Sequence, residues 1–309
     1  PPDADAATRA RLGYNALARL AGPDCGRFTA LARWLGSRGL SAPQVLAADT
    51  QAGFVLLEDL GDALFARIIA AGTAEAPLYE RAIDALAHLA GADAPSGVSA
   101  EDGRTVPLLA YDAVARGVEA GLLVEWFLPR ALGRAADDAM WADYRRLWAG
   151  LEPVLSAGPS VLVLRDFHAE NLLWLGDRPG VRAVGLLDFQ DAVIGSPLYD
   201  LVSLLEDARR DVDPELALRL RTIARGRLSE RGLDGELFEA AFAAHAAQRN
   251  AKIVGIFARL AIRDGKPAYL RLLPRVFAHL TRDLAHPALG ELRRWFDETI
   301  PPSRRTIDP

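Results

Sequence analysis

One segment of extended structure interrupts a long helical part of the chain, and this feature limits the possible folds more than any other. Residues 161–191 contain three apolar runs that are typical of strands, VLVL, NLLWL and VRAVGLLDF. From residue 76 onward, the sequence around this segment has apolar residues at helical spacing. Nearer the front, residues 27–38 predict a helix, and Val45–Ala48 and Phe54–Leu57 predict two strands. We therefore predict an α+β chain with a small strand-containing front part and a large helical part.

The composition argues against several classes of protein. The chain has 309 residues, of which 50% are hydrophobic, so it can bury a substantial core. Its net charge of −5 argues against a nucleic-acid partner. It has no apolar run of 18 residues and no signal peptide, which argues against a membrane partner. The single cysteine, Cys25, cannot form an internal disulfide and fits a reducing compartment, so we expect a cytoplasmic protein. The oligomeric state stays open.

Four polar side chains lie between two of the apolar runs, in the stretch LRDFHAENLLWL. The turn residues of GDRPG, 176–180, predict that the runs on either side of this turn pair as a hairpin. In that hairpin Asn171 falls opposite residue 187 or 188, and directly opposed residues have Cβ atoms about 5 Å apart. Asn171 and Asp188 therefore emerge together at the open end. An amide oxygen beside a carboxylate is typical of a site for a hard cation such as Mg²⁺.

A third polar group reaches the same end of the hairpin. Asp166 is the second residue after VLVL and precedes Asn171 by five, so the DFHAEN segment must loop over the hairpin mouth. A carboxylate base and a metal site made of an amide and a carboxylate are groups that phosphoryl transfer requires. In that reaction the protein mainly positions the acceptor hydroxyl and compensates charge. We predict Asp166 as the catalytic base, with Asn171 and Asp188 as metal ligands.

The order of these groups resembles the catalytic loop of kinases, which has the pattern H-x-D-x-x-x-x-N followed by an Asp-aromatic pair on the next strand. The segment DFQDAVIGSPLYDLVSLL, with Gly195, Pro197 and Asp200, resembles the corresponding part of aminoglycoside phosphotransferase-like kinases. Two longer segments, GLLDFQDAVIGSPLYDLVSLLEDARRDV and AAQRNAKIVGIFARLAIRDGKPAYLRLLPRV, closely resemble the anomeric N-acetylmuramate/N-acetylglucosamine kinases of bacterial cell-wall recycling. The resemblance extends from about residue 28 to residue 298.

This resemblance implies a two-lobed, protein-kinase-like fold with a mostly helical C-lobe, and ATP and Mg²⁺ as cofactors. The implied reaction moves the γ-phosphate of ATP to the C1 hydroxyl of the amino sugar. Residues 1–57 would be part of the N-lobe, 58–62 the hinge, and 63–309 the C-lobe with the catalytic loop and metal site. The stretch LEDLG resembles the hinge, so the cofactor-binding residues would be Glu58, Asp59 and Leu60, through backbone contacts with adenine.

The sequence departs from the family pattern in two places. Leu164 stands where the catalytic loop usually has a histidine, and we expect it to take over a structural role. No glycine-rich loop and no lysine precede QVLAAD, although such kinases begin with strands that carry both. We therefore expect the first strands, with the phosphate loop and its lysine, to be absent from the chain as given.

The predicted substrate residues are cations, amides, acids and a histidine. An arginine would fit the lactyl carboxylate of N-acetylmuramate, although a solvated helix face is the alternative for each cation. Gln190, Asp191 and Asn250 would bind sugar hydroxyls or the acetamido group, and Glu125 would line the acceptor side. His168 would either contact substrate or stabilise the loop, whereas we expect Asp200 to be a structural carboxylate that holds the loop. The cation candidates are Arg165, Arg209, Arg210, Arg249 and Lys252.

Two other functions stay open on the sequence. The chain could be a kinase for a different small molecule, of the aminoglycoside, choline or fructosamine type. It could also be a catalytically silent nucleotide-binding module, although the complete set of Asp166, Asn171 and Asp188 argues against that alternative.

Overall fold

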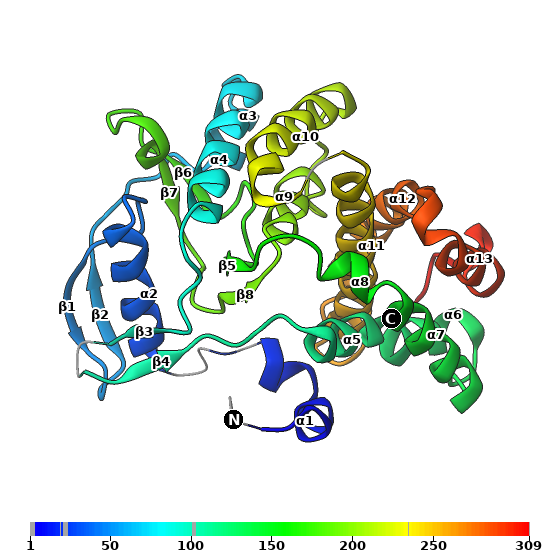
Figure 1. Cartoon of the computed structure of the whole chain (residues 1–309). Helices are drawn as coiled ribbons and strands as arrows, with labels where there is room; N and C mark the ends of the chain where they lie inside the picture. The colour runs from blue at the N-terminus through cyan, green and yellow to red at the C-terminus, as the bar shows by residue number, and fades with distance from the viewer. Residues whose placement is uncertain (1–3, 19, 21–23, 101–102, 234, 309) are drawn as a thin grey trace.

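The computed structural model describes residues 4–18, 20, 24–100, 103–233 and 235–308. In its smaller part, helix α2 (Cys25–Ser37) packs against the antiparallel pair β1 (Val45–Asp49) and β2 (Phe54–Leu57). A second antiparallel pair, β3 (Gly97–Ser99) and β4 (Thr105–Pro107), lies beside α2 (Figure 1). The two strands predicted for this part are confirmed, and the first is one residue longer than predicted.

The larger part is helical and surrounds α11 (Gly235–Ile262), a 28-residue helix that packs against α5, α9 and α12 (Figure 1). The first helix of the chain, α1 (Ala6–Ala18), lies against α5 in this part and not against β1 and β2. The other helices are α3 (Phe65–Ala70), α4 (Glu75–Ala90), α5 (Ala113–Leu122), α6 (Leu128–Leu132), α7 (Asp138–Gly150), α8 (Glu152–Leu155), α9 (Leu198–Leu205), α10 (Pro214–Leu228), α12 (Leu273–Asp283) and α13 (Gly290–Thr299).

Two short antiparallel pairs interrupt the helices. Strand β6 (Leu172–Trp174) pairs with β7 (Val184–Leu186), which confirms the hairpin. Strand β5 (Val161–Val163), in a predicted run, pairs with β8 (Val193–Gly195), which was not predicted. Residues 180–183, predicted in part as strand, form a 3₁₀ turn before β7. The predicted α+β fold with a helical majority is confirmed.

Helix α11 approaches α5 closely at one glycine. A Cβ atom on Gly255 would lie 2.3 Å from the carbonyl carbon of Leu122, the last residue of α5. There α5 continues into a π-helical turn, Leu123–Phe127, that also contacts α11. Only a residue without a side chain permits this approach. The contact fixes the rotation of α11 and therefore decides which of its side chains face the active site.

None of the helices in the described ranges is both long enough and apolar enough to cross a membrane.

Candidate active site

The hairpin brings the two predicted metal ligands together. Leu172 pairs with Leu186, and the N–H of Leu187 donates to the carbonyl of Asn171 at 3.0 Å. Nδ2 of Asn171 lies 3.3 Å from Oδ2 of Asp188 and also donates to the carbonyl of Asp166 at 3.0 Å. These contacts use the amide nitrogen of Asn171, so the amide oxygen is the atom that a metal would use. A carboxylate and an amide oxygen fit Mg²⁺, which binds one or two such ligands and completes its shell with waters and phosphates.

A buried carboxylate holds the start of the catalytic loop. Asp200 accepts hydrogen bonds from the backbone N–H groups of Leu164 at 2.7 Å and of Arg165 at 2.8 Å. Burial raises the pKa of Asp200 to about 7, although these two hydrogen bonds favour the ionised form. They are the contacts that the predicted structural role of Asp200 requires. Asp166 follows directly, and its own side chain is exposed.

A buried ionic network lies behind the loop. Arg165 is 5% exposed and donates to Oε1 of Glu119 at 2.6 Å. Lys252 lies 3.2 Å from Oε2 of Glu119 and donates to the hydroxyl of Tyr199 at 2.6 Å. Burial alone would raise the pKa of Glu119, but Lys252 and Arg165 hold it below its ordinary value. Glu119 therefore stays charged and neutralises part of the positive charge beside Asp166.

Arg165, Asp166 and Lys252 line a cleft of about 670 Å³. Its wall contains eight of the predicted residues, and five of them come from the segments around the hairpin, Arg165, Asp166, Asp188, Gln190 and Asp191. Nε2 of Gln190 donates to Oδ1 of Asp188 at 2.5 Å, so the amide orients the carboxylate that is predicted to bind the metal. The remaining lining residues come from α1, the α9 region and α11: Tyr14, Tyr199, Ala208, Arg209, Arg249, Lys252, Ile253, Ile256 and Phe257.

Four predicted substrate residues lie outside the wall of this cleft. Asn250 is fully buried and donates to Glu206 at 2.7 Å and to Asp283 at 2.9 Å. Arg210 pairs with the carboxylate of Glu75. His168 is buried in the loop, where burial lowers its pKa and its Nδ1 atom has no hydrogen-bond partner.

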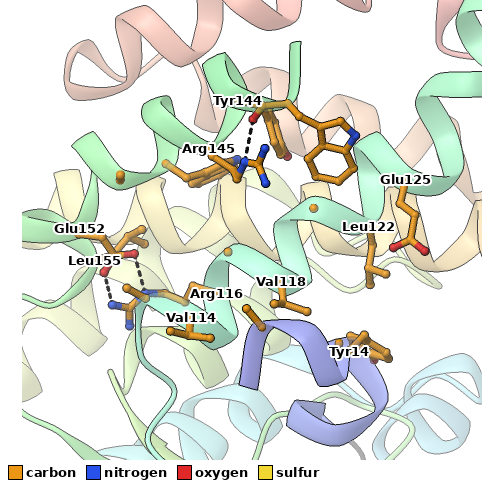
Figure 2. A pocket seen from close by; sticks show the side chains of 18 residues that line it. Tyr14, Val114, Arg116, Val118, Leu122, Glu125, Tyr144, Arg145, Glu152 and Leu155 are labelled. Carbon is orange, nitrogen blue, oxygen red and sulfur yellow. Dashed lines mark hydrogen bonds and ion pairs between the residues drawn. The ribbon is translucent and has the colours of Figure 1, made fainter. Parts of the chain in front are cut away.

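The fourth of these residues, Glu125, lines a different cavity. That cavity, of about 480 Å³, lies between α1, α5 and α7 and is mostly apolar (Figure 2). Tyr14 belongs to both cavities, whereas no catalytic-loop residue lines the second one. In Figure 2, Glu125 points into it from beside Leu122, across from Arg145. The structure therefore does not bring Glu125 together with Asp166.

The predicted hinge runs beside the hairpin. The backbone N–H of Trp174 in β6 donates to the carbonyl of Ala63 at 2.8 Å, and Leu64 forms an isolated antiparallel β-bridge with Leu173. Glu58 pairs with Arg178 at 2.5 Å, and Asp59 accepts from the N–H of Gly61 at 2.8 Å. The side chains of residues 58 and 59 are thus engaged with protein. The backbone N–H of Glu58 also donates to the carbonyl of Gln44 at 2.8 Å, so the predicted adenine contacts would use the carbonyl of Glu58 and the backbone of Leu60.

Three residues that shape the site were not singled out from the sequence. Glu119 anchors Arg165 and Lys252, and Tyr14 lines the cleft from α1. Arg27 of α2 is buried and donates to the carbonyls of Gln190 at 2.7 Å and Ala192 at 2.7 Å, which fixes the segment after Asp188. The helix has two arginines, and the sequence does not separate the buried Arg27 from the exposed Arg33. Glu119 and Tyr14 carry no local pattern.

Comparisons with known proteins agree with this geometry. A model of the phosphotransferase enzyme family matches residues 15–233. The chain is 48% identical to the N-acetylmuramate/N-acetylglucosamine kinase of Caulobacter vibrioides over 305 residues, which are 99% of this chain and 83% of that protein. It is 34% identical to the kinase of the same name from Pseudomonas putida over 275 residues, 87% of this chain and 76% of that protein.

Among solved structures, a choline/ethanolamine kinase family protein from Mesorhizobium loti has a similar fold. The TM-score is 0.55 at 16% identity, and the match covers 87% of this chain and 82% of that one. Together with the family match, this confirms the predicted protein-kinase-like fold. The family match spans the catalytic loop, both predicted metal ligands and Asp200. The chain therefore belongs to the phosphotransferase enzyme family as an ATP-dependent phosphotransferase, and its curated relatives are N-acetylmuramate/N-acetylglucosamine kinases.

Proposed function

We propose that the protein phosphorylates the C1 hydroxyl of N-acetylmuramate and N-acetylglucosamine, with ATP as donor and Mg²⁺ as cofactor. The observation that carries the proposal is the shared cleft of Asp166 and Asp188 in a chain 48% identical to a kinase named for these sugars. Because ATP is a cytoplasmic metabolite, we place the reaction in the cytoplasm. The products would be the sugar 1-phosphate and ADP, in the reuse of cell-wall amino sugars.

Asp166 has the position and exposure that a general base needs. It accepts the proton of the C1 hydroxyl while that oxygen attacks the γ-phosphorus. The new O–P bond forms as the bond from the γ-phosphorus to the β,γ-bridging oxygen breaks, and ADP leaves with that electron pair. Mg²⁺ bound by Asn171 and Asp188 would neutralise charge on the phosphates. Gln190, which donates to Asp188, keeps the carboxylate oriented for that role.

The sugar would bind on the α11 side of the cleft and the nucleotide on the hairpin side. Backbone groups of Glu58 and Leu60 would bind adenine, next to the hairpin that carries Asn171 and Asp188. Asp191 and Gln190 are within the wall, where polar groups would meet sugar hydroxyls. On the other side of the cleft, Phe257 of α11 offers an apolar surface for the sugar ring.

The charge of the cleft argues against the alternative acceptors. Aminoglycosides and choline are cations, and they favour an acidic pocket. Within the described ranges, the wall of this cleft has four basic side chains and three acids, Asp166, Asp188 and Asp191. Two of those acids are committed to the base and metal roles. Of the basic side chains, Arg165 and Lys252 pair with Glu119 and Arg209 pairs with Glu170, whereas Arg249 has no carboxylate of a described residue within ion-pair distance. A neutral or anionic acceptor therefore fits better than a cation.

Phosphorus NMR tests the reaction and its position together. The full-length natural protein is incubated with ATP, Mg²⁺ and either sugar, and an aminoglycoside is the control acceptor. We expect a new sugar 1-phosphate signal with both sugars and none with the aminoglycoside. A phosphomonoester at another carbon would overturn the anomeric assignment, and turnover of the aminoglycoside alone would overturn the substrate class.

A further inference from the structure

Most of the basic side chains of the cleft already have acidic partners. Arg165 and Lys252 share the buried carboxylate of Glu119, at 2.6 Å and 3.2 Å. Arg209 is 39% exposed and lies 3.0 Å from Oε2 of Glu170. These three positive charges are therefore matched within the protein or reach solvent.

Arg249 differs from them. It lines the cleft from α11 and is only 6% exposed. Its Nη2 atom donates to the hydroxyl of Ser203 at 2.8 Å, but Nη1 is buried without a hydrogen-bond partner. Among the described residues, no carboxylate lies within ion-pair distance of Arg249. A buried guanidinium with unused donors is unfavourable unless an anion binds it, so the site is incomplete in the protein alone.

The surroundings of Arg249 identify the missing group as part of the acceptor. Lys252 follows one helical turn later, and both cations lie against the ring of Tyr199, at 6.0 Å and 5.3 Å from its centre. Ile253 and Phe257 continue the same wall with apolar groups. In the proposed function, the phosphates of the nucleotide would bind at a separate cation site on the hairpin, so an anion beside α11 would belong to the acceptor.

We propose that Arg249, with Lys252 beside it, binds the lactyl carboxylate of N-acetylmuramate. A guanidinium can hold a carboxylate through two parallel hydrogen bonds, and the free Nη1 supplies the missing donor. N-acetylglucosamine has no carboxylate and would leave this subsite without an anion. The inference rests on the proposed function, because it assigns one substrate group to a part of the same cleft.

The two sugars make the test internally controlled. We expect Arg249→Gln to lower kcat/KM for N-acetylmuramate by about 10- to 100-fold, mostly through KM, because charge-assisted hydrogen bonds are lost. For N-acetylglucosamine, kcat/KM should change by no more than about threefold. The matched control is Arg209→Gln, which removes one positive charge from the same wall and should affect both sugars alike.

Each outcome decides the inference. An equal loss with both sugars overturns it and points to a role of Arg249 toward the phosphoryl group or the fold. No loss with either sugar overturns it as well and places the carboxylate elsewhere. If Arg249→Gln does not fold, as judged by thermal unfolding, Arg249→Lys replaces it, and a loss confined to N-acetylmuramate remains the required result. A wild-type protein that phosphorylates neither sugar would instead overturn the proposed function, and this inference with it.

Discussion

Two backbone conformations at the site are unfavourable for their residues. In the described part of the chain, the non-glycine residues with positive φ are Arg165, at 73°, and Asp188, at 56°. Such conformations cost on the order of 1 kcal/mol or more each and persist only where surrounding contacts enforce them. Asp200 binds the backbone of Arg165, and Glu119 binds its side chain. These two conformations turn the chain sharply at Arg165 and at Asp188, so that Asp166 and Asp188 both line the cleft.

At the scale of the residue, Asp166→Asn tests the predicted base. The amide cannot accept the proton of the hydroxyl, so we expect kcat to fall by about 10²- to 10⁴-fold. Binding of a fluorescent ATP analogue should stay within about twofold of the wild type, because Asp166 is not a predicted metal ligand. The exposed hairpin-turn variant Asp177→Asn makes the same chemical change away from the cleft and should keep wild-type kcat. A kcat near the wild-type value in Asp166→Asn would remove Asp166 from its role.

Among the elements, α11 shows why sequence spacing did not separate substrate residues from structural ones. Arg249 and Asn250 are neighbours in the chain, yet successive side chains on a helix point about 100° apart. Arg249 therefore lines the cleft, whereas Asn250 binds Glu206 and Asp283 on another side. Because α11 is buried on most of its faces, its apolar pattern does not identify the side that faces ligand.

The close contact between α11 and α5 gives a prediction at the same scale. Gly255→Ala places a methyl group 2.3 Å from the carbonyl carbon of Leu122, and backbone must move to admit it. We expect a loss of about 1–3 kcal/mol in the free energy of unfolding, measured with urea. The control is Gly226→Ala in α10, where a Cβ has nothing within 4 Å. That variant should gain about 0.5–1 kcal/mol, because alanine is favoured over glycine inside a helix. Equal effects of the two variants would contradict the packing argument.

In the molecule as a whole, a buried pair of carboxyl groups links three helices of the large part. Asn250 of α11 bridges Glu206, which follows α9, and Asp283, the last residue of α12. Burial, and then the carboxylate of Glu206, raise the pKa of Asp283 well above its ordinary value. The folded protein therefore holds a proton that the unfolded chain releases from near pH 3.8 upward. Since unfolding releases this proton, rising pH favours the unfolded state.

Asp283→Asn should remove this pH dependence. The neutral amide needs no proton, so the variant should gain stability relative to the wild type as pH rises from about 5 to about 8, by up to about 1.4 kcal/mol per pH unit. Urea unfolding of both proteins across this range measures the difference. Asp177→Asn, an exposed change, should leave the wild-type curve unchanged in slope. Parallel curves for the wild type and Asp283→Asn would show that Asp283 is ionised in the folded protein.

The sequence alone was sufficient to predict the half of the cleft that carries the proposed base and metal ligands. Asn171 and Asp188 are separated by one turn and two short strands. The hairpin pattern therefore predicts that they lie close together, and the prediction needs no information from the rest of the chain. The distance of Asp166 from Asn171 in the sequence predicted that Asp166 lies at the same end of the hairpin. The order of the three residues indicated the family. Contacts of this kind close short loops, and local patterns are sufficient to predict them.

Only the tertiary structure decided the acceptor half. Arg210 and Asn250 pair with buried or half-buried carboxylates, Glu125 faces another cavity, and Arg249 lines the cleft with an unused Nη1 donor. No local pattern separates these residues, because each lies on a helix whose rotation is set by packing against distant helices. The close approach at Gly255 sets this rotation for α11. Helix packing therefore decides which charged side chains can contact a substrate. The residues of the predicted catalytic loop are neighbours in the chain, so local sequence is enough to identify them.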